Sequence, residues 1–292
     1  MSKPDRSIPT FGLLFGATVW GIIWYPYRLL EQAGISGVAS SLYTYSIALM
    51  LGALLFALRR RGLTVVPASI FWLALAAGWT NLSYVLAVID GEVMRVMLLF
   101  YLSPFWTLLL ARLMLDERVG LVGTAVVVLS LCGAALMLWQ PESGLPLPQN
   151  TAEWLGLSSG MGFALTNVLT RKSTHLTLQA KSLAVWVGVV AMALLFLPFE
   201  SRPLPLPGEV GLSGLLLMGG IALLLMLATL LVQYGVTHMP VTRASVIFLF
   251  ELVVAAVTSY FLAHEVLSVR EWVGGAMIVA AALFAARMEE HA

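Results

Sequence analysis

One acidic residue lies well inside an apolar stretch of the chain. The run from 244 to 264 contains Glu251 and no other Asp, Glu, Lys or Arg. A carboxyl group in the middle of a membrane-spanning helix is costly unless it is protonated, paired or facing water. Glu251 could therefore carry a proton or bind an amine. The alternative is a structural carboxyl that bonds to a neighbouring helix end or hydroxyl, and the sequence leaves both interpretations open.

Four aromatic residues form a second group of candidates. Trp20, Trp79, Tyr84 and Tyr101 each lie several positions inside an apolar stretch, whereas Trp and Tyr usually gather at the ends of spanning helices. A ring that faces a cavity can pack against an apolar solute and still offer a hydrogen bond. Packing against lipid or other helices is the competing interpretation for each ring. As a set, the four residues favour a cavity for neutral or aromatic solutes.

Uncharged polar side chains inside the apolar stretches could complete such a site. They can bind the carboxylate and ammonium of a zwitterion without a buried charge, or they can simply hold helices together. Helix packing is the simpler interpretation for any one of them. Asn81 and Asn167 are the preferred candidates, because an amide is more costly to bury than a hydroxyl. The whole set is Thr80, Asn81, Ser83, Ser103, Thr166, Asn167 and Gln233.

Two prolines and two arginines mark further positions of interest. Pro26 and Pro104 interrupt apolar stretches, and a proline removes a backbone donor and permits a bend. Both are hinge candidates, with a static kink as the alternative. Arg95 and Arg243 fall at the starts of apolar stretches, where we expect the side chain to extend to the membrane surface.

Residue types that perform catalysis or hold metals do not cluster. Cys132 is the single cysteine, the four histidines have no ligand spacing, and no Walker loop, zinc motif or nucleophile constellation is present. An intramembrane enzyme would need convergent ionisable groups, and only Glu251 is available. We therefore expect no enzyme activity, no cofactor and no metal. The net charge of +1 gives no basic surface for nucleic acid.

The elements that must position these residues are apolar helices. Hydrophobic residues make up 60% of the 292 residues and charged residues 11%, where a soluble domain has about a quarter charged. None of the apolar stretches alternates with period two. The sequence predicts an all-α integral membrane protein with ten transmembrane helices in the lipid bilayer. The spans are 7–27, 32–58, 62–89, 96–111, 119–141, 154–170, 182–199, 210–242, 244–264 and 272–286.

Basic residues are distributed unequally between the two sides of this arrangement. Arg28, Arg95, Arg202 and Arg270 fall on one side, and the other twelve of the sixteen Lys and Arg residues fall on the opposite side. Cytoplasmic loops are enriched in Lys and Arg, so both termini should be cytoplasmic. The first apolar run lacks a cleavage site, and we expect a retained helix rather than a signal peptide.

The turn-rich stretch from 140 to 153 divides the chain into two halves of five helices. An odd number of helices forces the second half to enter the membrane from the opposite side, which is the inverted-repeat plan of many secondary transporters. We therefore expect a first repeat at 1–140, an extracytoplasmic linker at 141–153 and a second repeat at 154–292. Two overlays support the division: a shift of 148 places Arg95, Phe100 and Glu117 on Arg243, Phe248 and Glu265, and a shift of 144 places Gly12 and Gly16 on Gly156 and Gly160.

The segment from Glu92 to Gly123, EVMRVMLLFYLSPFWTLLLARLMLDERVGLVG, resembles the EamA-type repeat of the drug/metabolite transporter superfamily. The segment from Arg243 to Gly275 repeats the pattern, with Glu251-Leu252 where this family often has Glu-Pro. Within the superfamily, Trp20 and the run Tyr101-Leu102-x-Pro104-x-x-Thr107 are similar to the aromatic amino acid exporters. The resemblance implies ten helices, an inverted repeat and export of amino acids or similar metabolites across a bacterial inner membrane.

The leading hypothesis is a secondary transporter that exports neutral or aromatic amino acids and related metabolites by alternating access. Its partners would be the small-molecule substrate and the lipid bilayer, and the oligomeric state stays open, a monomer being compatible with the sequence. The alternative within the superfamily is a multidrug or other metabolite exporter. A structural helix bundle is a third hypothesis, although such a bundle would not need two related halves with polar groups inside the spans.

Overall fold

The computed structural model describes residues 7–58, 68–91, 93–118, 120–139, 147–200, 202–206, 209–262 and 268–287. Most of the predicted linker, 141–146, lies outside these residues, as do Lys3, Arg6, Glu265 and the basic residues 59–61. All regular structure in the described ranges is helical, which confirms the predicted class. The elements are α1 (Ser7–Gln32), α2 (Gly37–Leu58), α3 (Ala68–Asp90), α4 (Val93–Phe100), α5 (Ser103–Leu115), α6 (Leu121–Leu138), α7 (Thr151–Lys172), α8 (Leu178–Phe196), η2 (Leu197–Phe199), α9 (Leu212–His238), α10 (Val241–Phe248), α11 (Phe250–Leu262) and α12 (Val269–Arg287).

Eight helical stretches among the described residues are long and apolar enough to cross a membrane. α7 is not among them, because polar and charged residues interrupt its apolar character, and α12 is not among them either. The prediction of ten transmembrane helices in two inverted repeats therefore stays a prediction. The eight stretches are Ser7–Gln32, Gly37–Leu58, Ser69–Ala87, Arg95–Leu115, Leu121–Leu138, Leu178–Phe199, Leu212–His238 and Val241–Leu262.

Two of these stretches are interrupted helices. α4 and α5 are separated by Tyr101 and Leu102, and Pro104 follows in the first turn of α5, where a missing backbone N–H is tolerated. α10 and α11 are separated by Leu249 alone, whose N–H donates to the carbonyl of Val246. The second interruption thus forms without a proline. By contrast, α1 continues through Pro26 without interruption.

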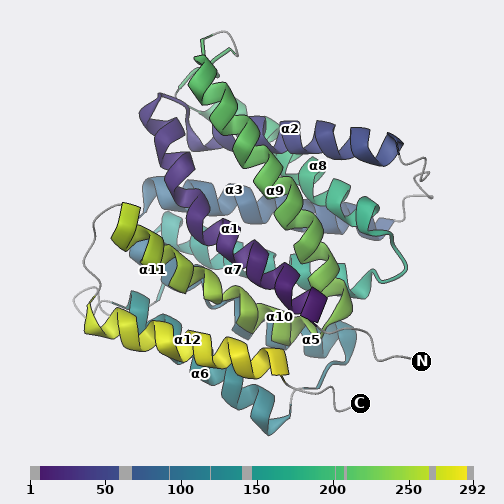
Figure 1. Cartoon of the computed structure of the whole chain (residues 1–292), viewed down its shortest axis with the longest axis vertical. Helices are drawn as coiled ribbons and strands as arrows, with labels where there is room; N and C mark the ends of the chain where they lie inside the picture. Colours follow the sequence, from purple (N-terminus) through teal and green to yellow (C-terminus); the bar gives the residue numbers. More distant parts are fainter. Residues whose placement is uncertain are drawn as a thin grey trace.

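The helices pack in a layered bundle (Figure 1). α6 and α12 lie together along one edge, α2 and α8 lie at the opposite side, and α1, α7 and α9 run between them. Contacts recur in pairs: α3 packs on α7 as α9 packs on α1, and α5 packs on α7 as α11 packs on α1. α7 and α1 are therefore the two helices around which the interrupted helices gather.

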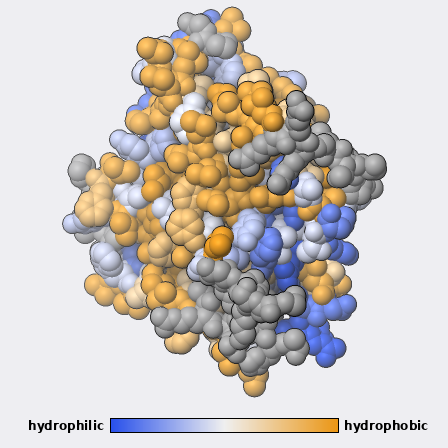
Figure 2. Space-filling view, turned by 45° about the vertical axis from the view of Figure 1, so that its right-hand side comes forward, coloured by the Kyte–Doolittle hydropathy of each residue, from blue (hydrophilic) through white to orange (hydrophobic). Residues whose placement is uncertain are grey.

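Glycines permit the close helix crossings. A Cβ atom on Gly12 of α1 would lie 2.7 Å from the backbone oxygen of Leu231 in α9, and one on Gly160 of α7 would collide with the backbone oxygen of Phe100. Replacement by any larger residue would push these helices apart. The surface around the bundle is apolar, with Leu121 91% exposed and Phe199 79% exposed. Figure 2 shows hydrophobic residues over most of one face, as expected of a surface that contacts lipid.

Candidate functional site

Four aromatic rings from four different helices meet where the interrupted helices break. Phe100 is the last residue of α4 and Phe248 is the last residue of α10. Phe163 of α7 lies between them, with ring centroids 5.7 Å from Phe100 and 5.2 Å from Phe248. Trp20 of α1 packs against Phe163 at 5.9 Å and against Phe248 at 5.6 Å. These distances are in the range of favourable aromatic contacts.

The cluster continues into a group that contains the intramembrane acid. Tyr84 of α3 and Tyr101 each pack edge-on against Phe100, with centroid distances of 5.1 Å. The phenols of Tyr101 and Tyr84 are both near enough to the carboxyl of Glu251 to interact with it electrostatically. Glu251 is half-buried in the first turn of α11, where the helix dipole favours a negative charge. The structure therefore gives Glu251 a phenol partner and a helix N-terminus. We call the six rings of these two paragraphs and Glu251 the aromatic cluster.

Two buried amides lie on the neighbouring helices α7 and α9. Asn167 of α7 and Gln233 of α9 are each 4% exposed, and Asn167 Nδ2 and Gln233 Oε1 have no hydrogen-bond partner. Asn167 precedes Arg171 by one helical turn and Gln233 precedes Thr237 by one turn, and Arg171 Nη1 donates to the carbonyl of Thr237. The two amides therefore lie at about the same height along α7 and α9, each one turn from the contact between Arg171 and Thr237. One offers a free donor and the other a free acceptor, and each unsatisfied group is costly to leave buried.

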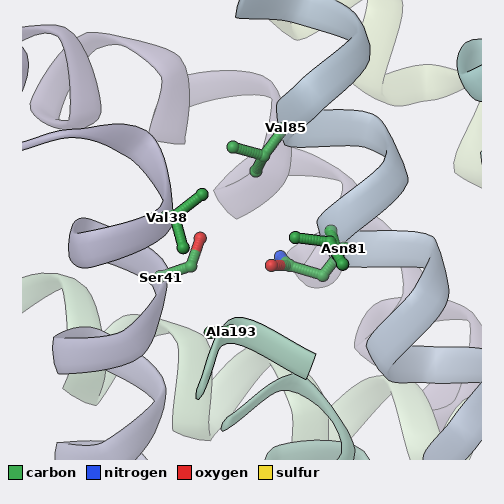
Figure 3. A pocket seen from close by; sticks show the side chains of 6 residues that line it. Val38, Ser41, Asn81, Val85 and Ala193 are labelled. Atoms are coloured by element: carbon green, nitrogen blue, oxygen red, sulfur yellow. The ribbon is translucent and has the colours of Figure 1, made fainter. Parts of the chain in front are cut away.

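No ring contact or hydrogen bond between side chains joins three of the predicted residues to this group in the described part of the chain. Asn81 of α3 borders a small hollow between α2, α3 and α8, where its amide faces Ser41 (Figure 3). Trp79 faces α7, with Cδ1 3.5 Å from the position of a Cβ on Gly162. Ser103 is buried as the first residue of α5. The remaining residues that line the hollow are Val38, Leu82, Val85 and Ala193.

The hydroxyl candidates mostly bond within their own helices. Thr80 donates to Ala76 O, Ser83 to Trp79 O and Thr166 to Gly162 O, at distances of 2.7, 2.6 and 2.9 Å. Such bonds satisfy the hydroxyl four residues back along the helix and leave little capacity for a solute. These three hydroxyls are therefore already bonded to the backbone of their own helices.

The expectation that Arg95 extends to the membrane surface is wrong. Its side chain is buried, with Nε 2.9 Å from Glu153 Oε1 and Nη2 3.1 Å from Glu153 Oε2. The carbonyl of Leu147 also accepts from Nη2, at 3.1 Å. Asn150 caps α7 by accepting from the Glu153 backbone N–H and donates to its carboxylate. Buried charges are tolerated when the guanidinium and the carboxylate form a bidentate pair and further hydrogen bonds satisfy their remaining polar atoms.

Sequence reasoning missed Phe100, Phe163 and Phe248 as site residues, because they lack a polar group. The overlay by 148 residues did contain a signal, since it places Phe100 on Phe248, but nothing in the sequence indicates that Phe163 joins them. Lys181 was also missed. The chain begins α8 at Leu178, before this lysine, and buries it to 1% exposure. The predicted spans end at charged residues, so the prediction assigns Lys181 to the loop before the span 182–199.

Comparisons with known proteins identify relatives of the chain. Residues 150–287 match the model of the EamA-like transporter family. An uncharacterized transporter of Archaeoglobus fulgidus is 30% identical over 211 residues, which are 71% of this chain and 72% of the relative. An uncharacterized transporter of Pseudomonas aeruginosa is 25% identical over 199 residues, 64% of this chain and 63% of that protein. A crystal structure with 17% identity superposes with a TM-score of 0.79 over 96% of this chain and 98% of the other, and shares its fold.

Proposed function

Because this chain belongs to the EamA-like transporter family, we propose that it exports neutral or aromatic amino acids and related metabolites across the bacterial inner membrane. It is a multi-pass membrane protein with eight apolar spans among its described residues. The transported solute is a small molecule, and movement is by alternating access.

The aromatic cluster is the observation that supports the proposed substrate class. It brings rings from α1, α3, α4, α7 and α10 to the place where α4 and α10 end. Backbone that leaves the helical pattern inside a membrane is tolerated where it is buried in protein or lines a route for solute. A solute with an aromatic or apolar side chain can exchange ring contacts with this cluster, so Trp20, Tyr84 and Tyr101 are the substrate-binding residues we propose there.

The two unsatisfied amides supply polar recognition without net charge. Asn167 Nδ2 can donate to a carboxylate or carbonyl, and Gln233 Oε1 can accept from an ammonium or amide. A zwitterion offers both groups and fits this pair better than a phosphorylated or strongly cationic solute. We leave Trp79, Asn81 and Ser103 out of the proposed site, because among the described residues no ring contact or side-chain hydrogen bond joins them to the aromatic cluster.

Alternating access would use two inverted halves of five membrane-spanning helices, at 1–140 and 154–292. The paired contacts of α3 with α7 and α9 with α1 support this arrangement, since α7 and α9 of the predicted second half would correspond to α1 and α3 of the first. Pro26 and Pro104 remain hinge candidates, and Pro104 has the stronger support because it adjoins an interruption. The excess of basic residues on one side supports cytoplasmic termini.

The decisive experiment is uptake into liposomes that contain the purified protein. Labelled phenylalanine, tryptophan, leucine and alanine, together with the cationic dye ethidium, are offered with and without a pH gradient. We expect saturable flux of the aromatic and neutral amino acids. Flux of none of them would overturn the proposal, and flux of ethidium alone would place the protein among multidrug exporters. In the same assay, an unchanged pH dependence in Glu251→Gln would assign Glu251 a structural role rather than proton coupling.

A further inference from the structure

The turn between α9 and α10 is held by three charged side chains, two from the helices α7 and α8 and one from the connection between α5 and α6. Arg171 of α7 donates through Nη1 to the carbonyl of Thr237, and Lys181 of α8 donates through Nζ to the Thr237 hydroxyl, both at 2.5 Å. On the other side of the turn, Glu117 Oε2 accepts from the backbone N–H of Val241 at 3.1 Å. We call these five residues the clasp.

The signs of the three charges match the helix ends that they contact. The carbonyl end of a helix carries a partial negative charge and the amide end a partial positive charge. The C-terminal turn of α9 receives the two cations, and the N-terminal turn of α10 receives the carboxylate. Arg171 and Glu117 therefore bond backbone groups at the turn, and Lys181 bonds the Thr237 hydroxyl, which itself donates to the carbonyl of Gln233.

This arrangement explains how Lys181 is tolerated at 1% exposure. Within the described part of the chain, no carboxylate lies at ion-pair distance from it. Its Nζ instead donates to the carbonyl of Thr170, in the last turn of α7, at 3.4 Å, and to Thr237 in the last turn of α9. The negative ends of two helices together offset the charge of this ammonium.

The clasp joins two sets of helices. α7 packs along α3, α4 and α5, whereas α9 and α10 pack along α1, and the two sets also touch where α5 meets α10 and α7 meets α9. Arg171 and Glu117, 3.4 Å apart, belong to the first set, and they reach across to Thr237 and Val241 of the second. Asn167 lies one helical turn before Arg171, and Gln233 lies one helical turn before Thr237.

We propose that the clasp is the gate that closes this end of the protein, and that its opening gives access to Asn167 and Gln233. By the predicted orientation this end faces the cytoplasm. Arg171, Lys181 and Glu117 act as positioning residues: they hold the turn of the second helix set against the first and contact no solute in this state. Separation of the two sets at this end requires all three contacts to break.

The ion pair of Arg95 and Glu153 provides a comparison at the opposite end of α7. It joins α4 to α7, two helices of the same set. Loss of that pair should weaken packing within the set without releasing the α9–α10 turn. Lys172 provides a second comparison, because it is an exposed cation next to Arg171 and has no contact with the turn.

The gate is tested by the accessibility of a cysteine placed directly above it. The full-length protein carries Gln233→Cys in a background where the exposed Cys132 is replaced by Ala, and a sulfonated, membrane-impermeant maleimide is added to inside-out membrane vesicles. Lys181→Met, Glu117→Gln and Thr237→Val each remove or weaken one contact of the clasp. Lys172→Met and Glu153→Gln are the controls. Size-exclusion profiles establish that each variant is folded, and Thr237→Val, which keeps every charge and nearly the same volume, serves where a charge variant fails to fold.

We expect the clasp variants to be labelled about tenfold faster or more, because loss of a hydrogen bond to a charged group shifts a two-state equilibrium by that factor. The controls should label at the parent rate. Unchanged labelling in the clasp variants, or an equal acceleration in Glu153→Gln, would overturn the gate. Labelling needs no substrate, so this outcome is independent of whether amino acids are the solutes carried.

Discussion

Phe100 and Phe248 end the two interrupted helices and pack against the same ring, that of Phe163, with centroids 5.7 and 5.2 Å away. The two residues occupy matching positions in the two predicted repeats. A helix from each half thus stops at one aromatic contact in the interior. A rearrangement of one predicted half relative to the other would change these ring contacts.

Replacement of Phe163 by Leu should lower flux of aromatic amino acids more than flux of leucine. Leu keeps most of the apolar volume but removes the ring that faces Trp20, Phe100 and Phe248. Competition between labelled phenylalanine and unlabelled leucine in proteoliposomes measures the change in preference. Phe105→Leu, at a ring 42% exposed on α5, is the matched control. An unchanged preference in Phe163→Leu would remove the ring from the substrate route.

Tyr101 and Glu251 should behave as a coupled pair. Tyr101→Phe removes the phenol oxygen that faces the carboxyl, and Glu251→Gln keeps the shape but removes the charge. Groups in direct contact commonly show interaction energies of about 0.5–3 kcal/mol in a double-mutant cycle. We expect the double variant to lose less thermal stability in detergent than the two single losses added together. Strict additivity would mean that the two side chains do not contact each other.

The apolar stretches of the sequence predict the helices well but not their interruptions or their buried charges. The predicted span 182–199 and the observed α8 (Leu178–Phe196) differ by a few residues. Because of that difference, Lys181 lies outside the predicted span but inside the observed helix. A helix end is set by its cap, here the Thr177 hydroxyl that accepts from Ala180 N, and hydropathy does not report caps. Pro104 indicates the first interruption, whereas Leu249 has no local signal.

The pairing of Arg95 with Glu153 could not be predicted, since it depends on tertiary structure. The two residues belong to α4 and α7, and only the packing of those helices brings them together. An arginine at the start of an apolar stretch has the same local sequence whether it extends to lipid headgroups or turns inward. The aromatic cluster shows the same limit, because the sequence identifies Trp20, Tyr84 and Tyr101 but not the phenylalanines that connect them.

Glu153→Gln should destabilise the protein by about 3 kcal/mol, because it leaves the buried guanidinium of Arg95 without its counter-charge. Thermal unfolding in detergent measures the loss. The exposed Glu209, whose carboxylate accepts from Leu206 N, gives the control Glu209→Gln, with an expected effect of about 0.5 kcal/mol or less. The double replacement Arg95→Leu with Glu153→Leu should recover part of the loss. Stability equal to the parent in Glu153→Gln would mean that the pair is not formed.

Asn167→Leu and Gln233→Leu should lower transport while leaving stability unchanged or raised. Each substitution removes a buried polar atom without a partner, and such an atom costs about 1–3 kcal/mol when it is left unsatisfied. An amide kept at that cost in a packed interior is expected where function requires it. Initial rates of amino acid uptake and unfolding temperatures are measured on the same preparations. Asn81→Leu, an amide outside the proposed site, should keep the parent rate. Loss of stability with full transport in Asn167→Leu and Gln233→Leu would identify the two amides as packing residues.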